Sequence, residues 1–367
     1  MIYSPWRHIS SIFWKRNPIQ LTFFLTRRCN ARCPFCFYLS DKNDAEKNAS
    51  ELTLPEIDKM SSTLGRLLWL AFSGGEIFLR NDLVEITKLF YQKNKPAIIL
   101  FPTNGLLTDI IREKIEAVLR FCKKSMIVVK LSLEGLEGIH DSLLGVEGGF
   151  QRVMLTYEAL GPLLDRYPNF ELGINTVFCS KNQDHMDDLI EFVSGLEKIR
   201  THTVSLIRGE VSDPALKQVD LGKYHETITK MELNLKKGIS NTYAFRGAKF
   251  KAAQDIVQRR LIYETMQHKK RQIPCYAGKL NLVITESGEV YPCESFSLRL
   301  GNIRESGYDV NRLLMTEQAR KAIQSIDANG CFCTHECYCM TNILFNPSMS
   351  PAVLKQYLKL RRKSPTA

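Results

Sequence analysis

Three cysteines lie within eight residues near the start of the chain. Cys29, Cys33 and Cys36 have the spacing C-x3-C-x2-C, and Phe35 directly precedes the third. An iron–sulfur cube has four iron corners, and cysteine thiolates are its usual ligands. Three thiolates from one short loop therefore leave one iron open to bind a cofactor. The alternative is a zinc knuckle, which needs a fourth ligand close by, yet the next histidine after the motif is His140.

The composition is that of a globular protein. Of the 367 residues, 44% are hydrophobic and 24% charged, which is enough for one large domain and a smaller one. The 11 cysteines gather mainly towards the two ends of the chain. This favours metal binding in a reducing compartment over disulfides, so we expect a cytoplasmic location. We find no secretory signal and no apolar run of the ~18 residues expected of a membrane span.

Apolar runs alternate with helical patterns over the first two thirds of the chain. Continuous apolar runs are typical of parallel strands that are buried on both faces. Their residues are 19–25, 67–72, 97–101, 126–133, 172–178 and 203–207. Helices are predicted from Thr53, which begins a capping box, and over 82–93, 109–122, 150–167 and 184–196. Six such units predict a parallel α/β sheet.

A second motif follows the second predicted strand. Gly74, Gly75 and Glu76 stand in the sequence Phe-Ser-Gly-Gly-Glu. Two glycines allow a backbone to approach a ligand closely, and a carboxylate accepts hydrogen bonds from an ammonium group. A Gly-Gly-Glu sequence alone indicates only a turn. About forty residues after the cysteine motif and directly after a strand, it indicates a cofactor site.

The two motifs together resemble the radical S-adenosylmethionine (radical SAM) superfamily. The resemblance implies a partial (β/α)6 TIM-like barrel whose functional loops follow the C-terminal ends of the strands. It also implies a [4Fe–4S] cluster on Cys29, Cys33 and Cys36, with S-adenosylmethionine at the open iron. One electron, from a donor such as flavodoxin or ferredoxin, then yields a 5′-deoxyadenosyl radical.

Further cofactor-binding residues are implied by the same resemblance. Phe35 belongs to the cysteine motif, and Gly74, Gly75 and Glu76 would bind the amino group of S-adenosylmethionine. Ser132 follows the fourth predicted strand and would meet the ribose, and Arg152 would hold the carboxylate. Asn104, after the third strand, either faces the pocket or finishes a turn. No residue is assigned a catalytic role.

The C-terminal part contains a second cysteine pattern. Cys275 and Cys293 flank a predicted β-hairpin, with Gly288 in its turn. The spacing C-x12-G-x4-C resembles the opening of the SPASM and twitch auxiliary-cluster domains of radical SAM enzymes. In those domains the hairpin presents both cysteines to one iron–sulfur cube.

The second half of this pattern departs from that family. The chain has Cys331, Cys333, Cys337 and Cys339, and six cysteines are too few for two fully ligated cubes. We therefore expect one auxiliary [4Fe–4S] cluster on Cys275, Cys293 and two of Cys331, Cys333 and Cys337, with Cys339 the weakest candidate. The short spacing between Cys331 and Cys333 argues against both binding one cube. A structural zinc ribbon is the alternative.

These patterns divide the chain into five expected segments. They are an N-terminal leader (1–18), a radical SAM core (19–208), a helical connector (209–271), a SPASM/twitch-like auxiliary iron–sulfur domain (272–342) and a basic tail (343–367). The leader contains Trp6, Phe13 and Trp14 beside basic residues. It would either pack on the core or rest on a membrane surface.

The sequence predicts an oxidoreductase or maturase-type enzyme. The expected reaction is abstraction of a substrate hydrogen atom to modify a peptide or protein side chain. Radical dehydrogenation or rearrangement of a small molecule or lipid headgroup is the alternative, and a non-catalytic electron carrier or zinc protein is the second. The net charge of +11 and the basic ends favour an acidic or membrane-associated substrate. No aromatic-interleaved basic stripe predicts nucleic-acid binding.

Overall fold

The core of the molecule is a curved parallel sheet surrounded by helices. A computed structural model describes residues 2–39, 51–243, 245, 247–328 and 330–360. Each of the six expected strands is present. They are β1 (Gln20–Phe24), β2 (Trp69–Ser73), β3 (Ile98–Thr103), β4 (Met126–Ser132), β5 (Phe170–Phe178) and β6 (Thr201–Leu206). They lie in the order β6-β5-β4-β3-β2-β1 and pair in parallel throughout, which confirms the partial barrel.

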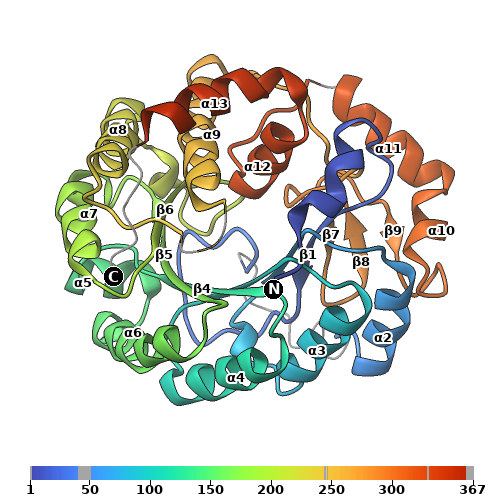
Figure 1. Ribbon diagram of the computed structural model, residues 1–367, viewed down its shortest axis with the longest axis horizontal. Helices are drawn as coiled ribbons and strands as arrows, with labels where there is room; N and C mark the ends of the chain where they lie inside the picture. Colours follow the sequence, from blue (N-terminus) through green and yellow to red (C-terminus); the bar gives the residue numbers. More distant parts are fainter. Residues whose placement is uncertain (1, 40–50, 244, 246, 329, 361–367) are drawn as a thin grey trace.

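Helices follow these strands and cover the outer face of the sheet, as the arc in Figure 1 shows. They are α2 (Leu54–Thr63), α3 (Leu83–Lys93), α4 (Thr108–Phe121), α5 (Glu137–Leu144), α6 (Gly149–Arg166) and α7 (Met186–Gly195), with short 3-10 turns η2 (Ile77–Leu79) and η3 (Gln183–His185). The capping box expected at Thr53 is present, since Glu56 accepts a hydrogen bond from the Thr53 N–H at 2.8 Å. The apolar faces of sheet and helices form one large core.

The sheet continues past β1 into the C-terminal part of the chain. β7 (Asn281–Ile284) pairs in parallel with β1, with Gln20 opposite Asn281. β8 (Glu289–Tyr291) and β9 (Gly301–Asn302) then extend it as antiparallel strands. The expected hairpin between β7 and β8 is therefore present, and it forms the far edge of a single nine-stranded sheet. The cysteines beside this hairpin are fixed rigidly to the barrel, because β1 and β7 share hydrogen bonds.

The remaining helices close the side of the barrel beyond β6 and support the hairpin. They are η4 (Pro214–Lys217), α8 (Leu221–Lys237), α9 (Ala248–His268), α10 (Val310–Leu314), α11 (Glu317–Ala328), α12 (Glu336–Leu344), η5 (Pro347–Met349) and α13 (Ser350–Lys359). In Figure 1, α9, α12 and α13 lie together on one side, while α10 and α11 flank β8 and β9. Residues 361–367 of the expected basic tail lie outside the described residues.

The N-terminal leader forms a 3-10 helix, η1 (Pro5–Ile12), that packs on the barrel with one face only. Arg7 donates a hydrogen bond to the Leu67 carbonyl at 2.8 Å, and His8 is buried. The opposite face leaves Trp6 and Phe13 about three-quarters exposed, at 75% and 71%. Among the described residues no helix is both long and apolar enough to cross a membrane.

Candidate functional site

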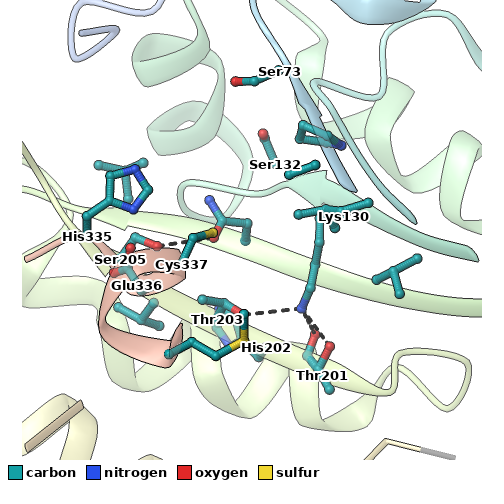
Figure 2. A pocket seen from close by; sticks show the side chains of 18 of the residues that line it. Ser73, Lys130, Ser132, Thr201, His202, Thr203, Ser205, His335, Glu336 and Cys337 are labelled. Atoms are coloured by element: carbon teal, nitrogen blue, oxygen red, sulfur yellow. Dashed lines mark hydrogen bonds between the residues drawn. The ribbon is translucent and has the colours of Figure 1, made fainter. Parts of the chain in front are cut away.

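One cavity of about 430 Å³ opens inside the barrel, within the usual range for small-ligand sites. The cysteine loop and the turn after β2 form one wall of the cavity, and strands β4 to β6 form the wall beside it. The wall opposite the sheet comes from α9 and α12. Figure 2 shows Ser132 and Lys130 projecting from one strand into this space, with Cys337 approaching from the helix opposite.

The cysteine loop is held by backbone hydrogen bonds to the turn after β2. The N–H of Gly75 donates to the Thr26 carbonyl at 2.7 Å, and the N–H of Glu76 donates to the Arg28 carbonyl at 2.8 Å. On its other side, the N–H of Arg32 donates to the Leu144 carbonyl at the end of α5, at 2.9 Å. The loop that carries the three thiols is therefore fixed just before Cys29 and again between Cys29 and Cys33.

The two glycines of this turn are required by that close approach. A Cβ at Gly74 would lie 2.4 Å from the Thr26 carbonyl oxygen, and one at Gly75 would lie 2.1 Å from that of Arg28. Gly74 also has φ +127°, which disfavours any residue with a side chain. The glycines thus admit a neighbouring protein backbone, a role that the sequence alone did not reveal.

Glu76 is buried and lines the cavity. Its carboxylate accepts hydrogen bonds from the N–H of Asn104 and the hydroxyl of Thr103, both at 2.9 Å, and from the N–H of Phe78 at 3.2 Å. A carboxylate offers about four acceptor sites, so one remains for a cationic ligand. Burial raises the pKa of Glu76 to about 7, despite these hydrogen bonds, and an ammonium group beside it would favour its charged form.

Asn104 combines the two roles that the sequence left open. Its side-chain oxygen accepts the N–H of Leu106 at 3.1 Å, which finishes the turn after β3. Its Nδ2 donates to Asn30 at 2.8 Å and approaches the sulfur of Cys29 at 3.8 Å. Asn104 therefore orients the cysteine loop and also lines the cavity.

The other predicted cofactor-binding residues differ in position. Phe35 and Ser132 line the cavity. Arg152 is exposed in the first turn of α6 and does not line it, so its carboxylate-binding role stays a prediction. His140 is buried, and its ring accepts a hydrogen bond from the N–H of Glu134 at 3.1 Å. Its role in the structure is therefore to hold the backbone after β4.

The three thiols of the loop fit an iron–sulfur cluster. Cys29, Cys33 and Cys36 all line the same cavity. Burial raises the pKa of Cys29 to about 11 and that of Cys33 well above its usual value, and neighbouring thiols add to both shifts. Backbone N–H groups point at the outer two sulfurs, each at 3.4 Å, as donors to a thiolate would. A bound metal deprotonates its thiol ligands, so this set suits a cationic cluster.

The C-terminal cysteines gather beside β7 and β8. Burial raises the pKa of Cys275, and the neighbouring thiols Cys293 and Cys331 raise it further. Burial likewise raises the pKa of Cys333 to about 12, with Cys275 and Cys293 adding to the effect. Cys293, Cys331 and Cys333 therefore each lie within electrostatic reach of Cys275. The short spacing of Cys331 and Cys333 does not keep either of them away from the other two.

Cys337 and Cys339 are the remaining candidates, and both lie on α12. Cys337 lines the barrel cavity, where the nearest charges are those of Glu294, Glu336 and Arg208. The pKa of Cys339 is raised by burial and then by Cys333.

A charged cluster joins the barrel to the C-terminal cysteines. Arg208, directly after β6, contacts the Glu294 carboxylate at 3.1 Å, that of Glu336 at 3.6 Å and the His335 ring at 3.0 Å. Its guanidinium also lies over the ring of Phe37, at 4.8 Å from the centroid. Glu294 is buried, but His335 and Arg208 outweigh the effect of burial and lower its pKa to about 2. The cluster places the cysteine-rich segment against the cavity.

Several residues of the cavity wall were missed in the sequence. Lys130 and Arg259 line it, as do the three side chains that contact Arg208. The signal for Lys130 was present, since it is the single charge in the apolar run 126–133. No local pattern marks Arg259, because α9 meets the barrel only through the tertiary fold.

Comparison with known proteins agrees with this geometry. Residues 23–213 match the model of the radical SAM superfamily, and residues 275–338 match that of an iron–sulfur cluster-binding domain, SPASM. The AdoMet-dependent heme synthase of Methanosarcina barkeri is 27% identical over 79% of this chain and 81% of its own. The antilisterial bacteriocin subtilosin biosynthesis protein AlbA of Bacillus subtilis is 28% identical over 80% of this chain and 59% of its own.

A solved structure shares the fold. Streptococcus suis SuiB bound to its precursor peptide SuiA superposes with a TM-score of 0.58, covering 94% of this chain and 76% of the other, at 17% identity. The expected cofactors are those of the matched families, a [4Fe–4S] cluster with S-adenosylmethionine and an auxiliary iron–sulfur cluster. By the match over residues 23–213, whose cysteine loop and Gly74–Gly75–Glu76 turn line one cavity, the chain belongs to the radical SAM superfamily, and by the match over residues 275–338 it carries a C-terminal SPASM domain.

Proposed function

We propose that this enzyme abstracts a hydrogen atom from a peptide or protein side chain. When bound, the cluster and S-adenosylmethionine together supply a 5′-deoxyadenosyl radical for that step. The carrying observation is one cavity that joins the Cys29, Cys33 and Cys36 thiols to a polar chamber at β4 to β6. A substrate must bind next to the site where the radical forms, and this chamber is continuous with that site.

The residues of this chain hold the cofactor in the proposal. The three loop thiolates bind three irons, and Glu76 accepts the ammonium of S-adenosylmethionine at its remaining acceptor site. Ser132 faces the ribose from β4, whereas Arg152, which is exposed outside the cavity, is left out of this set. The enclosing helices α9 and α12 keep water from the cavity, as a reactive radical requires.

The auxiliary cluster, in this proposal, is bound by Cys275 and Cys293 with Cys331 and Cys333. Their mutual effects on pKa support this set over one that includes Cys337. The segment 272–342 then acts as the auxiliary domain beside a core of 19–208. An electron donor such as flavodoxin or ferredoxin reduces the core cluster.

Two comparisons support a peptide substrate. AlbA takes part in the biosynthesis of a bacteriocin, and SuiB was solved with a precursor peptide. The test uses anaerobically reconstituted protein, dithionite, S-adenosylmethionine and synthetic peptides encoded by short open reading frames beside the gene. We expect 5′-deoxyadenosine to form together with a peptide mass loss of two hydrogen atoms, of which the radical takes one and the other leaves as a proton while the auxiliary cluster accepts the electron. If 5′-deoxyadenosine forms but no peptide is altered, the peptide substrate is refuted, while the radical step of the proposal still holds.

A small acidic substrate is the second candidate. The enclosed volume of about 430 Å³ and the cations on its wall favour it, and the similar heme synthase has a small-molecule product by name. The same assay with acidic metabolite fractions in place of peptides decides between them. Stimulation of deoxyadenosine formation by one set alone identifies the class.

Contact with a membrane surface is a further part of the proposal. The exposed face of η1 and the residues after it presents large apolar side chains beside Lys15 and Arg16. An apolar face with neighbouring cations binds anionic headgroups and the acyl boundary beneath them. The leader would then hold the enzyme against the membrane without spanning it.

A further inference from the structure

The polar chamber at β4 to β6 contains Lys130, which forms no ion pair with a carboxylate among the described residues. The Nζ of Lys130 contacts the Thr201 hydroxyl at 2.6 Å and the Thr203 hydroxyl at 3.2 Å. Its other two contacts are backbone carbonyls at 3.4 and 3.5 Å, longer than usual hydrogen bonds. Figure 2 shows the side chain extending from β4 towards these hydroxyls. Within the described residues Lys130 forms no ion pair.

Lys130 reaches this position because the residue that its side chain crosses is a glycine, which has no side chain to block it. Lys130, Gly173 and Thr201 are level with one another on β4, β5 and β6. A Cβ at Gly173 would lie 2.6 Å from the Lys130 Nζ and 2.6 Å from the Thr201 hydroxyl oxygen. The lysine side chain therefore crosses the middle strand over the glycine, and its ammonium group comes to the edge of the sheet that α9 covers.

A second cation meets the same edge from α9. Arg259 lines the cavity and donates to the His202 carbonyl at 3.4 Å. Its Nη1 is buried and has no hydrogen-bond partner in the part of the chain that the structure describes. Lys130 and Arg259 are thus bound to consecutive residues of β6, and the charge of Arg259 helps to lower the pKa of Lys130.

The other charged groups of the chamber do not neutralise this pair. Asp255 is bound by Lys251 and by the Tyr243 hydroxyl. Among the described residues Asp255 forms its ion pair with Lys251, not with Lys130 or Arg259. A cation taken out of water is costly unless a counter-charge accompanies it. Lys130 and Arg259 therefore have no ion-pair partner among the described residues, and the carboxylate of a ligand can provide one.

We propose that Lys130 and Arg259 bind a carboxylate group of the substrate and so select an acidic substrate, an inference that rests on the proposed function. Lys130 stands two residues before Ser132 on β4, which places it about 7 Å further from the cofactor end of the strand. A carboxylate there holds the substrate at its far end and leaves its other end towards the radical. The carboxylate comes from an acidic side chain of a peptide or from a small organic acid.

The test compares acids with their amides. Calorimetry on anaerobically reconstituted protein with S-adenosylmethionine measures binding of acetyl-Gly-Glu-Gly-amide and its Gln analogue, and of glutarate and glutaramide. We expect at least one acid to bind at least tenfold more tightly than its amide. Tighter binding of the peptide assigns the carboxylate to a peptide, and tighter binding of glutarate assigns it to a small acid.

Variants connect this preference to the residues. Lys130→Met and Arg259→Met should each reduce the preference for the acid, the first to within twofold. Gly173→Ala should do the same while keeping the lysine, because the new methyl group displaces its ammonium. Lys114→Met is the matched control, since Lys114 likewise forms no ion pair among the described residues and donates to backbone carbonyls, at 2.8 and 3.0 Å, but lies outside the cavity. The Lys114→Met variant should keep the preference of the parent for the acid over its amide.

The outcomes separate this inference from the proposed function. Equal binding of acid and amide, no binding of either, or a preference that survives Lys130→Met overturns the inference. Deoxyadenosine formation from S-adenosylmethionine without substrate is measured in the same samples. If it proceeds while the acid preference is absent, only the inference fails, and if it is absent while the preference is present, only the proposed function fails.

Discussion

The two cysteine regions of this molecule are built on different principles. Cys29, Cys33 and Cys36 belong to one short loop, and backbone hydrogen bonds to the Gly74–Gly75 turn and to α5 fix it in place. The C-terminal thiols come from separate segments, before β7, after β8 and ahead of α12. One site is local in sequence and rigid in backbone. The other exists only once β7 pairs with β1 and α12 packs beside them.

This contrast separates radical formation from the later reaction of the substrate. In the proposal the local site holds the cluster that binds S-adenosylmethionine, whereas the assembled site connects to the cavity through Arg208 and its carboxylate partners. The first should therefore act without the second, but the second should have no activity alone. Changes in either region test the comparison, from the largest expected effect to the smallest.

Removing the three loop thiols together should abolish radical formation. In the Cys29→Ala, Cys33→Ala, Cys36→Ala triple variant we expect no 5′-deoxyadenosine above background. The iron content should fall by about four atoms per chain, one cube. Chromatography of the quenched reaction and an iron assay measure both. Deoxyadenosine at parent levels would show that the loop is not the cluster site.

Removing one C-terminal thiol should leave radical formation in place. Cys293→Ala should lose about four iron atoms and substrate turnover, but should still form deoxyadenosine in the absence of substrate, within a few fold of the parent. The same two assays apply. Loss of all deoxyadenosine in a folded Cys293→Ala protein would mean that the two sites depend on each other, against the comparison.

A methyl group at Gly75 should displace the cysteine loop. Its Cβ would lie 2.1 Å from the Arg28 carbonyl oxygen, and such overpacking costs about 1–3 kcal/mol. We expect Gly75→Ala to lower the free energy of unfolding by that amount and to lower the iron bound at the loop. Gly65→Ala is the control, since nothing lies within 4 Å of a Cβ there. Equal behaviour of the two variants would contradict the close packing.

Lys130 should make stability depend on pH above neutrality. Burial lowers its pKa from 10.5 to about 7 in the folded chain, so between pH 7 and 10.5 the unfolded chain binds more protons. The free energy of unfolding should then rise with pH over this window. Lys130→Met should rise less between pH 7 and 9 in urea titrations. Parallel curves for the two proteins would show that the lysine is not desolvated.

The smallest effect concerns the leader. Replacing Trp6, Phe13 and Trp14 together by Ser should reduce sedimentation with phosphatidylglycerol vesicles several-fold and leave deoxyadenosine formation unchanged. These side chains are 62–75% exposed and support neither cysteine site. Leu155→Ser is the matched control, because Leu155 is also exposed, at 62%. A core substitution such as Ile115→Ser is not suitable, because Ile115 is buried. Undiminished vesicle binding would exclude the leader as the membrane contact.

The sequence by itself determined the parallel sheet, and its resemblance to a known family gave the barrel and the proposed core cluster site. Each strand was a continuous apolar run, because a parallel strand buried on both faces leaves no polar alternation. The proposed ligands of the core cluster lie within one loop, so their spacing alone predicts the site. The Gly74–Gly75–Glu76 turn was found for the same reason, although its glycines turned out to admit the Arg28 backbone.

Only the tertiary structure decided the composition of the cavity. The pairing of β7 with β1 brings Glu294 to Arg208, and the alignment of Lys130, Gly173 and Thr201 depends on the register of three strands. Neither is encoded by spacing along the chain, because the residues come from segments that are far apart and meet only through long-range packing. A lone lysine in an apolar strand was visible from the start, but the groups that it faces were set by the fold.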